Sequence, residues 1–121
     1  MNILHSRIQN FQPLVRSLIY THDGWIVGGA AKFIVGLTDE DPRDIDILIP
    51  FYEWGKASRI IPRGSPANSF GGFKVKCGDV DVDVWAGDIG WFMCHTSLID
   101  DIALNVNSRT ILTRSQANII K

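Results

Sequence analysis

The stretch Trp25–Ile47, WIVGGAAKFIVGLTDEDPRDIDI, decides the fold of this chain. Its first three residues are apolar and predict a short strand, and Gly28 and Gly29 follow at once. The next residues are mostly small or apolar and end at Gly36. This pattern predicts a short helix, because glycine commonly terminates helices. A strand that turns directly into a helix through two glycines is therefore the first expected feature.

A polar loop at 38–43 separates this helix from a strand expected at 44–49, DIDILI. The strand alternates at first and then becomes wholly apolar, as central strands do. Asp44 and Asp46 stand two residues apart, so their side chains project from one face of the strand, roughly 6.5–7 Å apart along it.

A second acidic strand is expected at 80–85, VDVDVW, after a hairpin turn at Gly78-Asp79. Strict alternation places its valines on one face and Asp81 and Asp83 on the other. An acid on an adjacent strand lies about 5 Å across from its neighbour. Either acid can therefore join the two aspartates of the earlier strand.

The rest of the chain completes the expected α+β domain, a small mixed sheet with helices packed on one face. Apolar residues recur every three or four positions from 3 to 19, which predicts a helix that Pro13 splits or kinks. The other expected elements are a helix at 51–59, a loop at 60–70, a strand at 73–76, a short helix capped by Asp88, a strand pair around Asn107-Ser108, and a short helix or frayed end at 115–121. A length of 121 residues predicts one domain, 1–121.

Three converging carboxylates repel one another unless cations lie between them. Oxygen ligands at this spacing suit Mg²⁺, which keeps several waters and takes its remaining ligands from substrate phosphates. Mn²⁺ prefers the same ligands. Two such ions can activate an attacking hydroxyl and stabilise a leaving pyrophosphate.

A separate chemical reason favours glycine at positions 28 and 29. Without a Cβ, the backbone can approach an anion closely, and the helix that follows aims its free N–H groups at phosphates. The alternative is a tight strand-to-helix turn with no ligand.

Together these motifs resemble the nucleotidyltransferase superfamily that includes DNA polymerase β. GGAAKFIVG followed by PRDIDI is similar to the GGAVRDLLLG and PKDIDI pattern in the head domain of CCA-adding enzymes and bacterial poly(A) polymerases. Lys32 takes the place of that pattern's arginine, and Phe33 takes the place of its aspartate. SFGGFKVKCGDVDVDVW is similar to the strand pair that carries the superfamily's third acid, which favours Asp83 over Asp81. CHTSLIDDIAL resembles a further segment, RRDFTINALAY, in its apolar frame only.

The resemblance implies a polymerase β palm-like nucleotidyltransferase fold and a two-metal-ion mechanism with Mg²⁺ or Mn²⁺. The implied catalytic and metal-binding residues are Asp44, Asp46 and Asp83, and the implied nucleotide-binding residues are Gly28, Gly29 and Lys32. The implied reaction transfers a nucleotidyl group from an NTP, such as ATP, to a hydroxyl of an RNA 3′ end, a protein or a small molecule, and releases pyrophosphate. RNA processing is the corresponding context. We expect a catalytic core without the helical domain that reads the base.

Composition and charge limit which other classes of protein this chain can belong to. The net charge of −1 gives no global basic footprint for long nucleic-acid tracts. No apolar run approaches the ~18 residues of a membrane span, and the N-terminus lacks the apolar core of a signal peptide, so a cytoplasmic protein is expected. Cys77 and Cys94 are expected to be reduced thiols, and together with His95 they supply too few ligands for zinc.

Several interpretations stay open. The chain can be a non-catalytic module of the same fold that binds a nucleotide or a partner, or one half of a two-protein nucleotidyltransferase system. Trp85 and Trp91 are expected in the core, although Trp85 can also line the nucleotide pocket. His95 is expected to be partly buried. Side chains that contact either substrate or only solvent are Arg43, Ser65, Asn68, Ser69, Lys74 and Lys76. Base preference, acceptor and oligomeric state do not follow from the sequence.

Overall fold

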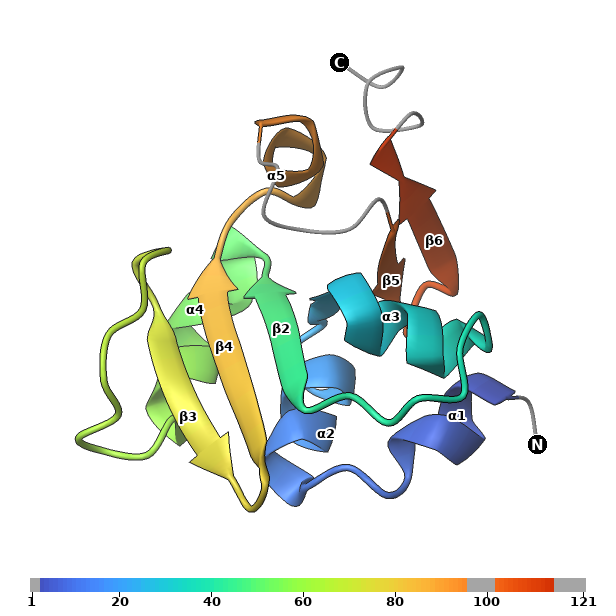
Figure 1. Ribbon diagram of the computed structural model, residues 1–121. Coiled ribbons are helices and arrows are strands. Elements are labelled where there is room, and N and C mark those ends of the chain that lie inside the picture. The colour runs from blue at the N-terminus through green and yellow to red at the C-terminus, as the bar shows by residue number, and fades with distance from the viewer. Residues whose placement is uncertain (1–2, 96–101, 115–121) are drawn as a thin grey trace.

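The computed structural model describes residues 3–95 and 102–114 of the chain. A six-stranded sheet lies at its centre (Figure 1), and its strands follow the order β3-β4-β2-β1-β5-β6. The strands are β1 (Trp25–Val27), β2 (Asp44–Ile49), β3 (Phe73–Cys77), β4 (Val80–Ala86), β5 (Ile102–Asn105) and β6 (Thr110–Thr113). β2 and β4 run parallel, and the other neighbouring pairs are antiparallel. The expected α+β class and mixed sheet are confirmed.

Five α-helices and one short 3-10 helix accompany the sheet in the described residues. They are α1 (Ile3–Ile8), α2 (Pro13–Tyr20), α3 (Gly28–Val35), α4 (Phe51–Ala57), η1 (Ser58–Ile60) and α5 (Ile89–His95). Pro13 splits the N-terminal helical region, because it occupies the first turn of α2, where a missing N–H needs no partner. Gly36 ends α3 in the left-handed conformation, with φ 88°, as expected of a terminating glycine.

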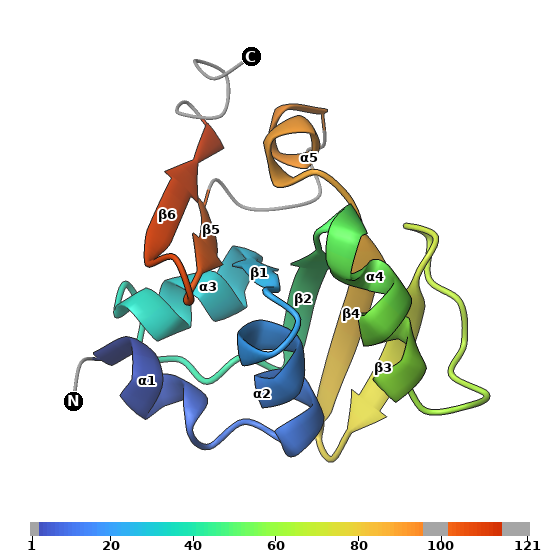
Figure 2. The same cartoon turned by 180° about the vertical axis from the view of Figure 1, so that it is seen from behind.

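One face of β2 and β4 is entirely apolar. Ile45, Ile47 and Ile49 of β2 point to this face, and they form one cluster with Val82 and Val84 of β4 and with apolar residues of α1, α2 and α3. Figure 2 shows α2 and α4 on this side of the sheet. The period-two pattern of the two strands therefore gives the main core.

The opposite face carries α5, so the prediction that helices pack on one face is wrong for this helix. Phe92 and Met93 of α5 pack with Leu48 and Trp85, which lie at the carboxyl ends of β2 and β4. The reason is local. Both strands change from acidic to apolar residues on this face near their ends, and the apolar ends need a cover.

The predicted cap of α5 and the predicted turn between the last two strands are confirmed. Asp88 caps α5, since its Oδ1 accepts a hydrogen bond from the N–H of Trp91 at 2.8 Å. β5 and β6 flank the turn that contains Asn107 and Ser108. The expectation for the tail, 115–121, lies outside the described residues, as does part of the weakly matching segment from Cys94. Within the described ranges, none of the helices combines the length and apolar character needed to cross a bilayer.

Candidate functional site

Parallel pairing of β2 and β4 brings four acids onto one face of the sheet. Asp44 lies opposite Asp81, and Asp46 lies opposite Asp83. Asp44 is exposed, whereas the other three are partly buried. The structure therefore places the three predicted site acids on adjacent strands, with Asp46 and Asp83 as direct neighbours.

Asp46 is the most perturbed of these acids. Burial, repulsion from Asp83 and repulsion from Asp44 raise the pKa of Asp46 from 3.8 to about 6, and Lys74 partly opposes them. Asp81 is not among the causes. The carboxylates that interact electrostatically at the site are thus those of Asp46, Asp83 and Asp44, the same three residues that the sequence motifs indicated.

Asp83 has two partners from outside β4. Its Oδ2 lies 3.6 Å from Nζ of Lys74, which stands opposite it on β3. Its Oδ1 accepts a hydrogen bond from Nδ2 of Asn68 at 3.2 Å. These contacts fix the carboxylate from both sides while Asp46 remains next to it.

Asn68 is a site residue whose role the sequence left open. Its Oδ1 accepts hydrogen bonds from the N–H groups of Phe70 and Gly72, at 3.1 and 2.9 Å, while its Nδ2 also donates to the carbonyl of Phe73 at 3.0 Å. Gly72 permits this fold of the loop, because a Cβ there would lie 1.9 Å from the carbonyl oxygen of Val84. The available signal was an Asn in a stretch rich in Ser, Pro and Gly, which favours an Asx turn but does not indicate the contact with Asp83.

The glycine pair lies beside the acids. Val27 of β1 is paired with Asp46, so Gly28 follows at the same edge as that carboxylate. Gly28 has φ 70°, and a Cβ there would lie 3.9 Å from Oδ2 of Asp46. Gly29 is exposed and has open space where its Cβ would be.

A hollow of about 380 Å³ joins the start of α3 to the acids. It is lined by Gly29, Thr38, Glu40, Asp41, Pro42, Arg43, Asp44 and Asp46. Asp83 does not line it. The hollow therefore contains one glycine of the pair and two of the predicted acids, together with the polar loop that joins α3 to β2.

The remaining predicted cations take different places. Lys32 lies within α3 and is partly buried. Lys74 and Lys76 point to the same face of β3, opposite Asp83 and Asp81 respectively, and both are exposed. Lys74 forms an ion pair with one of these acids, Asp83.

The predicted metal ligands do not form a closed cage. Among residues 3–95 and 102–114, no three His, Cys, Asp or Glu side chains lie close enough together to hold an ion. The chemistry of the donors nevertheless fits a hard divalent cation, because the carboxylates of Asp46 and its neighbours repel one another and Lys74 opposes this repulsion only in part. Mg²⁺ fits such an open set, since it commonly uses one or two carboxylates and completes its ligands with water and phosphate.

The aromatic residues separate into buried and exposed members. Trp85 is buried, as expected, but Trp91 is 61% exposed, so the core prediction is wrong for Trp91. His95 is also exposed rather than partly buried, because it lies at the end of α5, stacks on Trp91 and contacts the carbonyl of that residue at 2.8 Å. Both cysteines are free thiols.

Comparison with models of protein families, with curated proteins and with solved structures found no match for this chain. The geometry and chemistry of the site are therefore what indicate a function for this chain.

Proposed function

We propose that the chain is a metal-dependent nucleotidyltransferase that moves a nucleotidyl group from an NTP to a hydroxyl acceptor and releases pyrophosphate. The proposal includes the polymerase β palm-like fold that the sequence motifs imply. An RNA 3′ end, a protein and a small molecule are the acceptor classes to be tested.

The observation that carries the proposal is the shared hollow of Gly29, Asp44 and Asp46, with Asp83 next to Asp46 on the adjoining strand. The start of an eight-residue helix with an exposed glycine suits phosphate oxygens, because its first N–H groups have no partner within the helix. Carboxylates suit the cations that accompany those phosphates. Both halves of an NTP–metal complex thus find suitable groups in one place.

In this proposal Asp44, Asp46 and Asp83 would share Mg²⁺ or Mn²⁺, with one or two of these carboxylates on each ion and with water and substrate phosphate as the other ligands. When bound, the metal stabilises the charge that develops on the attacking and leaving oxygens. The chain's own residues position the reactants. The N–H groups at Gly28 and Gly29 bind phosphate, and Asn68 holds the carboxylate of Asp83 in place.

Label transfer tests the proposal directly. The protein is incubated with each α-³²P-labelled NTP, Mg²⁺ or Mn²⁺, and separate pools of RNA, protein and small hydroxyl compounds. We expect labelled product and pyrophosphate with at least one pool. Asp44→Asn and Asp46→Asn should reduce the label to background, because each removes a charged ligand with almost no change of shape.

Asp79→Asn is the matched control, since Asp79 is an exposed acid in the β3–β4 turn. Its label transfer should equal that of the wild-type protein. Asp81→Asn and Asp83→Asn then identify the third acid, and we expect only Asp83→Asn to abolish transfer. Absence of product with every acceptor pool and both metals would contradict the proposal.

A non-catalytic nucleotide-binding module is the second candidate, and the Lys74–Asp83 ion pair favours it. That pair occupies one oxygen of the third acid at 3.6 Å, and the acids form no closed metal site within the described residues. Calorimetry distinguishes the candidates. Mg²⁺-dependent NTP binding without pyrophosphate release would support the module, whereas turnover would exclude it.

A further inference from the structure

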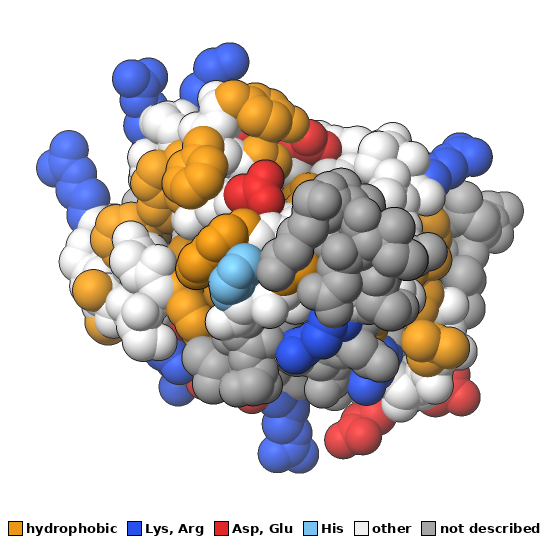
Figure 3. Space-filling model, turned by 90° about the horizontal axis from the view of Figure 1, so that it is seen from above, with side chains coloured by type: hydrophobic (Ala, Val, Ile, Leu, Met, Phe, Trp, Pro, Cys, Tyr) orange, Lys and Arg blue, Asp and Glu red, His pale blue; other side chains and the backbone are white. Residues whose placement is uncertain are grey.

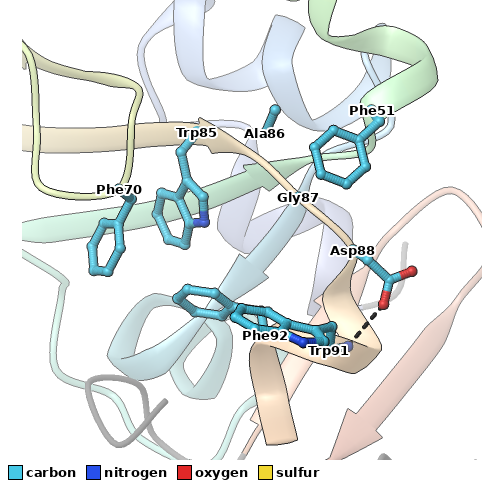
Figure 4. Close-up of a pocket in the computed structure, with 8 residues that line it drawn as sticks. All are labelled: Phe51, Phe70, Trp85, Ala86, Gly87, Asp88, Trp91 and Phe92. Atoms are coloured by element: carbon cyan, nitrogen blue, oxygen red, sulfur yellow. Dashed lines mark hydrogen bonds between the residues drawn. The ribbon is translucent and has the colours of Figure 1, made fainter. Parts of the chain in front are cut away.

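A second pocket lies at the carboxyl end of β4, beyond the acids. It has a volume of about 260 Å³ and is lined by Phe51, Phe70, Trp85, Ala86, Gly87, Asp88, Trp91 and Phe92 (Figure 4). Figure 3 shows hydrophobic side chains gathered on the face of the molecule that carries α5, with an acidic side chain among them. Pockets that bury a whole drug-sized ligand measure roughly 300–1,000 Å³, so this pocket suits one ring system rather than a whole nucleotide.

Three aromatic rings form the fixed part of the pocket. Phe70 stacks on Trp85 with ring centres 4.7 Å apart, and Phe92 meets these rings at 5.7 and 5.1 Å. The other two aromatic residues, Phe51 and Trp91, are 69% and 61% exposed. Their side chains can rotate without disturbing the core, so they can admit a flat ligand and cover it.

An unpaired polar atom shows which chemistry the pocket would bind. Nε1 of Trp85 is buried and has no hydrogen-bond partner within the described parts of the chain. Figure 4 shows this nitrogen on the edge of the indole that faces Gly87 and Phe51. A buried N–H without an acceptor is unfavourable, so a ligand that supplies an acceptor gains from this site. A purely apolar ligand does not satisfy it.

Asp88 adds an acceptor at the rim of the pocket. Its Oδ1 accepts the hydrogen bond that caps α5, and the residue is exposed. A ligand that combines a flat aromatic ring, an acceptor and an N–H donor matches the rings, Trp85 and Asp88 together. Nucleobases have this combination on their edges.

The position of the pocket connects it to the acids. Trp85 stands two residues after Asp83, on the same face of β4, roughly 6.5–7 Å along the strand. One loop contacts both, since Asn68 donates to Asp83 and Phe70 stacks on Trp85. A base in the pocket would therefore stay within reach of phosphates held near Asp46, with the ribose between them.

We infer that this aromatic pocket binds the base of the nucleotide, with Trp85 donating its indole N–H to an acceptor of the base. The inference rests on the proposed function for the identity of the ligand. It assigns to base contact Trp85, which the sequence analysis left open as a residue of the nucleotide pocket, and adds Phe70, Trp91 and Phe92, which the sequence did not identify.

Nucleosides without phosphate or metal test the pocket apart from the acids. The four ribonucleosides are added separately to ¹⁵N-labelled protein without Mg²⁺, and the indole N–H signals of the four tryptophans are followed by NMR. The Trp85 signal is identified by its loss in Trp85→Phe. We expect at least one nucleoside to move it downfield, as hydrogen bonding to an acceptor does.

Variants measure each contribution. Trp91→Ala should weaken nucleoside binding roughly 5- to 140-fold, the range for loss of one base–aromatic stack. Trp85→Phe keeps a ring and loses the donor, so it should weaken binding roughly 2- to 12-fold. Tyr52→Ala is the control, because Tyr52 is exposed on α4 but does not line the pocket. Its binding should equal that of the wild-type protein.

The outcomes separate this inference from the proposed function. A Trp85 signal that no nucleoside moves would overturn the inference even if NTP turnover is observed. Nucleoside binding that survives both Trp variants would also overturn it. A Trp85 signal that moves with protein concentration alone would assign the pocket to a second copy of the chain and overturn it. Nucleoside binding that depends on Trp85 and Trp91 would support the pocket even where label transfer fails, and the failure would then concern the acids.

Discussion

The two faces of β2 and β4 differ in almost every physical property. On one face, Ile47 and Val84 are fully buried in the main core. On the other, Asp46 and Asp83 lie side by side, and Lys74 pairs with Asp83. Alternation along the strands assigns every residue to one face or the other, so one pair of strands supplies both stability and a site.

The acidic face lowers the stability of the folded state when Asp46 is ionised. Asp46 has its pKa raised to about 6 by burial and by two neighbouring carboxylates, which means that its ionised form is disfavoured in the folded state. The apolar face offsets this effect through buried side chains. A group that is unfavourable in the free protein and suited to a cation is expected of a binding site.

The largest effect is expected on the apolar face. Ile47→Ala removes a fully buried side chain from the centre of the core, and such truncations cost about 2–5 kcal/mol because a cavity remains. Urea unfolding at pH 7 measures the change in the free energy of unfolding. Ile111→Ala is the control, since Ile111 is 46% exposed and its change should stay within about 0.5 kcal/mol. Equal losses in the two variants would mean that the described core is wrong.

A pH-dependent effect is expected on the acidic face. The pKa of Asp46 is raised from 3.8 to about 6 on folding, so the folded state binds more protons than the unfolded state between these values. The contribution of Asp46 to stability is therefore fully present below pH 3.8 and is lost as the pH rises through about 6. Asp46→Asn should remove this loss, so the variant should be more stable than the wild-type protein at pH 7.

Thermal unfolding at several pH values between 3.5 and 7.5 checks this sign. The quantity to compare is the difference in Tm between Asp46→Asn and the wild-type protein, which should grow with pH and level off above about 6. Asp79→Asn is again the control, because Asp79 is exposed in a turn. A Tm difference that shrinks as the pH rises would contradict the assigned burial and repulsion. Addition of Mg²⁺ should raise the Tm of the wild-type protein more than that of Asp46→Asn.

Much of this arrangement could be predicted from the sequence, because the signals are local. The alternation of VDVDVW and DIDILI fixes which side chains share a face, and Gly36 fixes the end of α3. The parallel register of β2 and β4, in contrast, does not follow from any local pattern in the sequence. It decides that Asp46 faces Asp83 rather than Asp81, and only the packing of the whole sheet determines it.

The pocket and the role of Asn68 could not be predicted for a related reason. Phe51, Phe70 and Trp91 come from three separate segments, and each is an ordinary aromatic residue in the sequence. Their convergence depends on the position of α5, which the sequence placed on the wrong face. Asn68 reaches Asp83 because Gly72 lets the loop approach β4, a contact that no pattern of neighbouring residues indicates.

The two glycines beside the acidic face should respond oppositely to the same substitution. Gly28→Ala forces an alanine into φ 70°, which costs about 1–2 kcal/mol. The Cβ added by Gly29→Ala meets no atom within 4 Å, and the substitution replaces a helical glycine. The free energy of unfolding of this variant should therefore exceed that of the wild-type protein by up to about 0.5–1 kcal/mol. Urea unfolding measures both changes.

The Gly29→Ala variant also tests where the phosphates of a nucleotide bind. Gly29→Ala adds a methyl group to the hollow that contains Asp44 and Asp46, so we expect a stable variant with weaker binding of Mg²⁺–NTP in calorimetry. Such a result would separate the phosphate site from the fold. Unchanged NTP binding in Gly29→Ala would show instead that phosphate does not approach this backbone.

The smallest effect is expected at Lys74, the cation that pairs with Asp83. Lys74→Met keeps most of the side chain and removes the charge that lies 3.6 Å from Asp83. Because Lys74 is 53% exposed, its loss should change the free energy of unfolding by only about 0–1 kcal/mol. The pKa of Asp46 should nevertheless rise, since Lys74 lowers it in the wild-type protein. The pH range over which stability is lost should therefore extend upward.

Lys76→Met provides the matched control for this last change. Lys76 points to the same face of β3 as Lys74, but it stands opposite Asp81. Its substitution by Met removes the same charge from the protein. Carboxyl ¹³C NMR titration of Asp46 in both variants separates a local ion pair from a general change of net charge. A larger shift in Lys74→Met would show that Lys74 acts through Asp46 and Asp83. Equal shifts would mean that the acidic face responds only to total charge, and the distinction between Asp83 and Asp81 would then lose its electrostatic basis.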